Sequence, residues 1–410
     1  MAETFEKKLY VGIDLDGDAA MVSFSYGNEE PQTVSPLAGS EIFSIPMAVA
    51  LRKDGSWAYG EEARRIAQAG VGTLVDQLLV RALNGEQVTL GEHVFPLTEL
   101  LARFLKKLVS MAGRLGPKAS LECLVLTTGR LDEPMIRLLQ TCVGFMELPA
   151  EKVHLIDHKD SFFYYGTHQP PELSAHDIGL FDCDRESIHF WCLQREQPTK
   201  PQLMNIREEH YGFDLQQADE IFAHLIPQAF GKQIISSVYL VGDEFSGGWM
   251  KQSLQLLCQG RRVFLGKNLF SKGACFGAMS LSDSHPAKYI YFGAHTIKCN
   301  VSLKVYERGD MSFFSLITAG KPWYEENCSA ELILDSTPTV DFWIQQPFDR
   351  QARIESVELA ALPQRKNKTT RIRIDAVPTS DHEVKLTLTD LGFGELVAGT
   401  GKKWEYLLCL

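Results

Sequence analysis

Residues 10–24, YVGIDLDGDAAMVSF, contain two short, apolar and β-rich runs separated by an acidic turn. Asp-Gly between two such runs is a strong signal for a β-hairpin. The stretch therefore predicts a strand, a tight turn and a second strand. Three carboxylates, those of Asp14, Asp16 and Asp18, lie at this turn together with Gly17.

The same pattern returns at residues 178–193, IGLFDCDRESIHFWCL, where Asp182 and Asp184 lie in a second acidic turn. Two equivalent hairpins, each opening an α/β region, predict a duplicated core. We expect one lobe over about residues 1–175 and a second over about residues 176–284. Ligands of such folds bind at strand ends between the lobes.

Two helices are predicted with clear boundaries. Apolar residues recur every three or four positions over residues 97–115, and the pair Gly116-Pro117 then stops the pattern. A second helix is expected over residues 132–144, because Asp132 is a good N-cap and Pro134 suits the first turn.

The sequence changes character after about residue 285. Strict alternation replaces the helical period, as in residues 371–377, RIRIDAV, and turn signals recur at short spacing. Residues 285–410 are therefore predicted to form an all-β module, with the boundary at His285-Pro286. The expected fold class is a two-lobed α/β domain followed by a β-sandwich.

Composition excludes several classes of function. The net charge is −11, from 52 acidic and 41 basic residues, which argues against nucleic acid or an acidic membrane surface as the main partner. No apolar run approaches the roughly 18 residues of a membrane span. The basic run at residues 365–371 is interpreted as a solvated turn.

Nine cysteines are scattered along the chain without a Cys-x-x-Cys pair. Several lie in apolar runs, so we expect buried, reduced thiols and a cytoplasmic location. The histidines, among them His154, His158 and His189, are also dispersed and are expected in core or surface roles. The pattern Asp14-x-Asp16-Gly-Asp18 fails as a calcium loop, because Ala19 and Ser25 occupy its required glycine and glutamate positions.

Taken together, these segments resemble the DnaK-type heat-shock chaperones, which belong to the actin-like ATPase superfamily. The resemblance is spread over most of the chain. It rests on residues 11–15 (VGIDL), 45–50 (IPMAVA), 59–63 (YGEEA), 124–129 (LVLTTG), 179–182 (GLFD), 240–243 (LVGD) and 273–278 (GACFGA), followed by the β-module.

The resemblance implies a nucleotide site between the lobes and Mg-ATP as its ligand. Asp14 and Asp182 match the carboxylates that orient magnesium-bound water in that family, which also makes them the candidate metal residues. Asp157 roughly matches another acid of the site. Gly242 matches a glycine of the adenosine motif.

The departures from the family are equally specific. Where the family has a glycine and two threonines, this chain has Asp16, Gly17 and Asp18, and the second glycine-rich turn falls on residues 184–187. Phosphate sites need amides, cations or a metal facing the anion. Two like charges at about 4 Å cost on the order of 4 kcal/mol at an effective dielectric near 20. We therefore expect little or no ATP hydrolysis.

The leading hypothesis is a chaperone-like scaffold with a degenerate nucleotide site that binds a peptide or protein partner through its β-module. Phe313 and Phe342 are the candidates for a peptide groove, although core packing is favoured for both. Two alternatives stay open: a divergent ATP-dependent chaperone, and a purely structural assembly partner. The sequence leaves the oligomeric state open.

Overall fold

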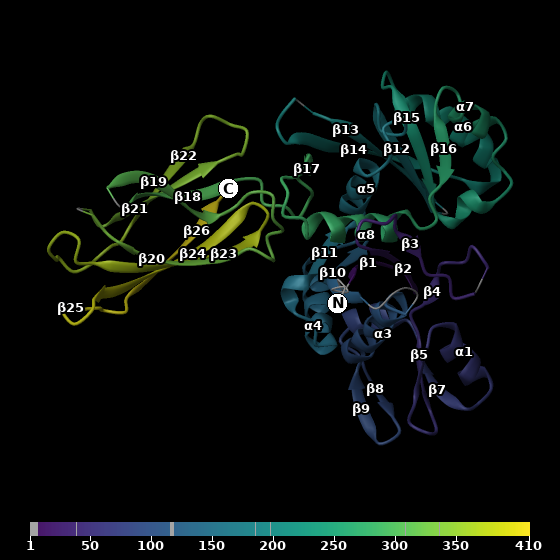
Figure 1. Ribbon diagram of the computed structural model, residues 1–410, viewed down its shortest axis with the longest axis horizontal. Helices are drawn as coiled ribbons and strands as arrows, with labels where there is room; N and C mark the ends of the chain where they lie inside the picture. Colours follow the sequence, from purple (N-terminus) through teal and green to yellow (C-terminus); the bar gives the residue numbers. More distant parts are fainter. Residues whose placement is uncertain are drawn as a thin grey trace, which may run out of the picture. The chain divides into compact units, whose positions relative to one another are not determined.

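The structure is a computed structural model that describes residues 7–37, 39–114, 119–184, 186–196, 198–307, 309–335 and 337–410. The chain divides into two compact units, Met1–Tyr289 and Ile290–Leu410. The boundary lies within β17 (Tyr289–Tyr291), a few residues after the predicted boundary at 284/285. The first unit is mixed α/β and the second is rich in strands (Figure 1).

The first sheet has the strand order β11-β10-β1-β2-β3, and β4 also pairs with β2. Strands β10 and β11 run parallel to β1, whereas β2 and β3 continue the sheet in antiparallel fashion. Its strands are β1 (Lys7–Asp16), β2 (Ala19–Tyr26), β3 (Gln32–Thr33), β4 (Ile45–Pro46), β10 (Ala119–Thr128) and β11 (Val153–Asp157).

The second sheet repeats this plan. Its order is β16-β15-β12-β13-β14-β17, with β15 and β16 parallel to β12 and with β13 and β14 continuing the sheet in antiparallel fashion. Its strands are β12 (Asp177–Cys183), β13 (Ser187–Arg195), β14 (Gln202–Gly212), β15 (Ile235–Val241) and β16 (Arg262–Leu265). The two hairpins thus occupy equivalent places in two sheets of the same topology.

Both predicted hairpins are confirmed. In the first, Asp16 pairs with Ala19, which leaves Gly17 and Asp18 as a two-residue turn. Gly17 has φ +53°, a conformation that glycine adopts without steric cost, and open space surrounds its Cα.

The helices follow the predicted patterns with small shifts at their ends. Helix α3 ends at Ala112, and the predicted stop at Leu115, Gly116 and Pro117 lies outside the described residues. Asp132 caps α4 as predicted, because its carboxylate accepts the N–H of Met135 at 3.1 Å. The helices are α1 (Glu61–Gln68), α2 (Leu78–Leu83), α3 (Leu97–Ala112), α4 (Glu133–Met146), α5 (His158–Thr167), α6 (Ala218–Phe230), α7 (Gln252–Leu257) and α8 (Leu269–Leu281).

The last helices of the two halves are exchanged between the sheets (Figure 1). Helix α5 follows the first sheet but packs on the second, where the Phe162 ring contacts that of Trp191. Helix α8 follows the second sheet but packs on the first, and a Cβ on Gly12 of β1 would lie 2.3 Å from the Cys275 backbone nitrogen. The two helices touch each other at Gly273, whose missing Cβ makes room for the Ser161 carbonyl.

A smaller sheet and short elements complete the first unit. Strands β6, β5 and β7 form a three-stranded sheet next to α1, and β8 pairs with β9. These elements are β5 (Val49–Arg52), β6 (Trp57–Tyr59), β7 (Gly72–Val75), β8 (Gln87–Leu90), β9 (His93–Pro96) and the 3-10 turns η1 (Ala150–Lys152), η2 (Leu215–Gln217) and η3 (Asp243–Ser246).

The second unit consists of two antiparallel sheets around one core, which confirms the predicted strand-rich region. One sheet has the order β19-β18-β21-β22, and the other has β20-β23-β24-β25, with β26 also on β24. Leu303, Phe342, Ile374 and Leu386 belong to their common core. The strands are β18 (Asn300–Glu307), β19 (Asp310–Ile317), β20 (Cys328–Ile333), β21 (Thr339–Gln345), β22 (Arg353–Glu358), β23 (Arg371–Ser380), β24 (Glu383–Phe393), β25 (Val397–Ala398) and β26 (Lys403–Cys409).

The basic run before β23 is not simply a solvated turn. The Arg365 side chain is buried there and donates to both carboxylate oxygens of Asp390, at 2.7 and 2.8 Å. The interpretation of residues 365–371 was therefore wrong at Arg365, because its partner lies in a distant strand.

Among the described residues, no helix combines the length and the apolar character needed to cross a bilayer.

Candidate functional site

The two acidic turns lie close enough together to perturb one another. Burial raises the pKa of Asp182 to about 6, and the negative charges of Asp16, Asp184 and Asp14 add to this effect while His158 opposes it. Because Asp14 and Asp16 come from the first sheet and Asp182 and Asp184 from the second, the structure brings both turns to one place. We call these four residues the acidic centre.

Asp14 is held by a histidine that the sequence did not single out. The Nε2 atom of His158 lies 2.8 Å from Asp14 Oδ1, and both side chains are more than nine-tenths buried. The His158 ring stacks on Phe270 with centroids 3.8 Å apart. His158 is the first residue of α5, and Phe270 lies in the first turn of α8. Helix α5 therefore supplies the partner of the Asp14 carboxylate, and helix α8 covers that partner.

The charge state of His158 follows from this contact. Burial by itself lowers the pKa of His158, but the charge of Asp14 and its hydrogen bond outweigh burial, and Asp16 and Asp182 add to them. The net shift of the pKa is upward, which favours the imidazolium form. Asp14 and His158 thus form a buried ion pair in the acidic centre.

The remaining acids of the first turn face solvent. Partial burial and the charge of Asp14 raise the pKa of Asp16. Asp18 contributes its backbone, since its carbonyl accepts the N–H of Met47 at 2.8 Å.

The Asp184 side chain holds the second turn together through hydrogen bonds to residues of that turn. Its carboxylate accepts the backbone N–H groups of Glu186 and Ser187 at 2.8 and 2.7 Å, and the Ser187 hydroxyl at 2.8 Å. Burial works against ionisation, but these hydrogen bonds outweigh it and lower the pKa of Asp184. The turn therefore keeps a fixed carboxylate where the resemblance implies glycines.

Asp157 and Gly242 have structural roles. The Asp157 carboxylate accepts the N–H of Asp160 at 2.8 Å, while Asp160 reaches back to the Asp157 N–H, so the pair forms a capping box for α5. Gly242 has φ +106°, and a Cβ there would lie 2.1 Å from the Cys183 carbonyl oxygen. Its glycine is thus explained by the close approach of β15 to β12.

The two candidate groove residues of the β-module lie on opposite faces of their sheet. Phe313 is 59% exposed, whereas Phe342 is fully buried in the core. Core packing, the favoured interpretation, is confirmed for Phe342, whose side chain packs between the sheets and cannot line a peptide groove. Phe313 remains exposed and contacts the ring of Trp343 at a centroid distance of 5.3 Å.

His158 was expected only in a core or surface role, although the sequence held a signal for its part in the site. Its signal was its place directly after Asp157, at the end of the strand two positions from β1 in the sheet. Strand ends on one edge of a parallel sheet lie together, so a polar residue there is a site candidate.

Comparison with known proteins places the chain by family. Residues 30–294 match the C-terminal part of a family of unknown function, DUF5716, and residues 296–410 match a domain of unknown function, DUF8552. None of the curated proteins matches the chain. Because the first match spans more than half of the sequence, the chain belongs to the DUF5716 family.

Proposed function

We propose that this protein is a chaperone-like scaffold with a degenerate nucleotide site, which binds a peptide or protein partner and hydrolyses little or no ATP. The first unit is, in this proposal, an actin-like domain related to that of the DnaK-type chaperones. Two features support the fold assignment: the strand order repeated in both sheets, and the placement of α5 against the second sheet and of α8 against the first.

The observation that carries the proposal is the buried pair between Asp14 and His158. Asp14 matches the carboxylate that orients magnesium-bound water in the DnaK-type chaperones. Here Asp14 Oδ1 accepts from His158 at 2.8 Å, and the stacked Phe270 ring covers the imidazole. A divalent cation at Asp14 would have to displace or face an imidazolium, which opposes cation binding.

The charges around this pair also fit Mg-ATP poorly. Asp14, Asp16 and Asp184 all raise the pKa of Asp182, which means that the acids already repel each other without a ligand. A triphosphate would add further negative charge. The two turns present carboxylates where a phosphate site presents amides and glycines.

Nucleotide titration tests this part of the proposal. We expect no binding heat when Mg-ATP is titrated into the full chain, and no phosphate release above that of buffer. Asp182→Ala should behave identically. Turnover of Mg-ATP that disappears in Asp182→Ala would instead establish the divergent ATPase.

The partner surface is proposed on the outward face of the sheet β19-β18-β21-β22. Phe313 is exposed beside Trp343, and Trp343 pairs across the strands with the half-exposed Ile354. We call Phe313, Trp343 and Ile354 the outer patch. Strand β19 lies at the edge of this sheet, so an extended peptide can add to it and place alternate side chains on the patch.

A peptide array probed with the full chain tests the outer patch. Apolar extended peptides should bind the wild-type protein, and Phe313→Ser should weaken that binding at least about tenfold, as expected when a central apolar contact is lost. Leu407→Ser is the matched control, since Leu407 is 55% exposed on the other sheet. Absence of peptide binding, or equal loss in both variants, would favour the structural assembly partner.

We also propose a cytoplasmic location. The nine cysteines, all within the described residues, are free thiols, and five of them are buried in the first unit. Reduced thiols are typical of that compartment.

A further inference from the structure

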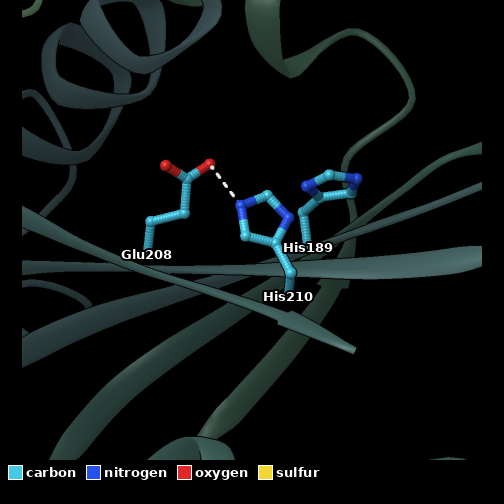
Figure 2. Close-up of side chains that lie close together, drawn as sticks. All are labelled: His189, Glu208 and His210. Carbon is cyan, nitrogen blue, oxygen red and sulfur yellow. Dashed lines mark ion pairs between the residues drawn. The ribbon is translucent and has the colours of Figure 1, made fainter. Parts of the chain in front are cut away.

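We infer that His189, Glu208 and His210 form a binding site for a divalent transition metal ion of the zinc type. The inference is independent of the proposed scaffold function. It rests on the placement of three ligand side chains on β13 and β14 and on the groups that orient them (Figure 2).

The strand register brings the three side chains together. His189 of β13 lies directly opposite His210 of β14, and Trp191 lies opposite Glu208. Directly paired residues and those two positions apart share one face of a sheet. One ligand atom from each of the three residues lies within 4.8 Å of the other two. Figure 2 shows the three side chains on the same side of the strands, with a His189 nitrogen facing the His210 ring.

Polar neighbours fix the protonation of His189. Ser187 donates its only hydroxyl proton to Asp184 at 2.8 Å, so its oxygen can accept from His189 Nε2 at 3.1 Å. Nε2 then carries the ring proton, and Nδ1 keeps the lone pair that a metal needs. Such an outer contact is how metal-ligating histidines are usually oriented.

Glu208 is oriented in a similar way. Lys159 of α5 donates to Oε2 at 2.6 Å, and the Trp191 indole N–H donates to Oε1 at 3.0 Å. Oε1 also lies 3.5 Å from His210 Nε2. Oε1 and one nitrogen of each imidazole therefore lie within 4.8 Å of one another.

The donor set selects the class of ion. Two imidazoles and one carboxylate suit zinc and its first-row neighbours, whereas magnesium and calcium prefer an all-oxygen shell. Three protein ligands leave further coordination positions open to water or a partner group.

The position of the site on the sheet means that a bound ion would affect the acidic centre. Asp182 of β12 lies opposite His189 in the sheet register, so Asp182, His189 and His210 form one row across three strands. Their side chains share the face that α5 partly covers. A cation held at the end of this row would offset the negative charge of the acidic centre.

Metal titration of the full chain tests the inference. The protein is first stripped with a chelator, and Zn²⁺ is then added while binding heat and melting temperature are followed. We expect one equivalent to bind and the melting temperature to rise with zinc concentration, as for any ligand specific to the folded state. Co²⁺ should bind in its place and give the visible absorption of a nitrogen-containing site.

Variants distinguish this site from adventitious binding. His210→Ala and Glu208→Gln change exposed side chains and should each weaken zinc binding at least about tenfold. His93→Ala removes an exposed histidine elsewhere in the first unit and should bind zinc like the wild type. Unaltered zinc affinity in both site variants, or no stoichiometric binding to the wild type, would overturn the inference.

Discussion

The two acidic turns occupy equivalent positions in two sheets of the same topology. Their first carboxylates, those of Asp14 and Asp182, nevertheless have different neighbours. Asp14, near the end of β1, is paired with the buried His158 at 2.8 Å. Asp182 lies near the end of β12. Burial and the charges of the neighbouring acids raise its pKa to about 6. One position has become a structural ion pair, whereas the other keeps a carboxylate that titrates close to neutrality.

The difference arises from the exchanged helices. Helix α5 places its first residue, His158, beside Asp14, and helix α8 covers that residue with Phe270. In the second turn, Asp184 binds its own loop through Ser187 instead. A duplicated backbone therefore does not impose duplicated chemistry, because Asp14 takes its partner from a helix and Asp184 takes its partners from its own loop.

The largest expected effect is on the Asp14–His158 pair. His158→Leu leaves Asp14 as a buried charge without its partner, and we expect the free energy of unfolding of the first unit to fall by about 3–5 kcal/mol. Urea denaturation followed by tryptophan fluorescence measures it.

The double variant Asp14→Leu with His158→Leu is the control for this change, because it removes both charges. It should recover much of the loss. If His158→Leu is as stable as the wild type, the pair is not the feature that sets the two turns apart.

The second largest expected effect is the difference in stability cost between alanine substitutions at the glycines beside the two turns. Gly242→Ala combines φ +106° with a Cβ placed 2.1 Å from the Cys183 carbonyl oxygen. We expect it to lower the free energy of unfolding by about 2–4 kcal/mol. Gly17→Ala is the matched variant, since Gly17 also has positive φ but open space around it. Its cost should be only about 1 kcal/mol, and equal costs in thermal denaturation would contradict the contrast.

The smallest expected effect concerns the pH dependence of stability. The folded-state pKa of Asp182 is raised from 3.8 to about 6. Its ionisation therefore opposes folding above about pH 6, and this penalty disappears as the pH falls below 4. Asp182→Asn should stabilise the protein by on the order of 2 kcal/mol at pH 7.5 and have little effect at pH 4.

Asp184→Asn should change the free energy of unfolding in the opposite direction, by lowering it at neutral pH. The folded-state pKa of Asp184 is lowered, so its carboxylate stabilises the fold above its ordinary pKa and loses this contribution as the pH falls. Urea midpoints of both variants and the wild type make the comparison, measured from pH 7.5 to well below 3.8, because the Asp184 contribution is lost only below that ordinary pKa. Parallel pH profiles for Asp182→Asn and the wild type would show that Asp182 has an ordinary pKa.

Local patterns in the sequence were sufficient for much of the fold. The hairpin at Gly17, the cap at Asp132 and the change to strands near residue 285 all depend on neighbours a few positions away. Both acidic turns were found for the same reason. Strand β14 was missed, because its alternation is weak: Arg207, Glu208 and Glu209 follow one another.

Long-range partners could not be read in this way. Nothing near Arg365 indicates Asp390, and nothing near His189 indicates His210, although Ser187, His189 and Trp191 alternate as residues of one strand face do. These pairs depend on strand register, which is set by the packing of the whole sheet.

The amino-acid sequence established that this chain has two acidic hairpins, an α/β region and a β-module, because turn chemistry and apolar periodicity are local properties. The folded chain was needed to reveal that Asp14 is paired with His158, that Asp182 is surrounded by acids, and that two histidines and a glutamate meet on one sheet face. The first two facts depend on which helix covers which sheet and on contacts between residues more than a hundred positions apart. The third depends on the register of β13 on β14.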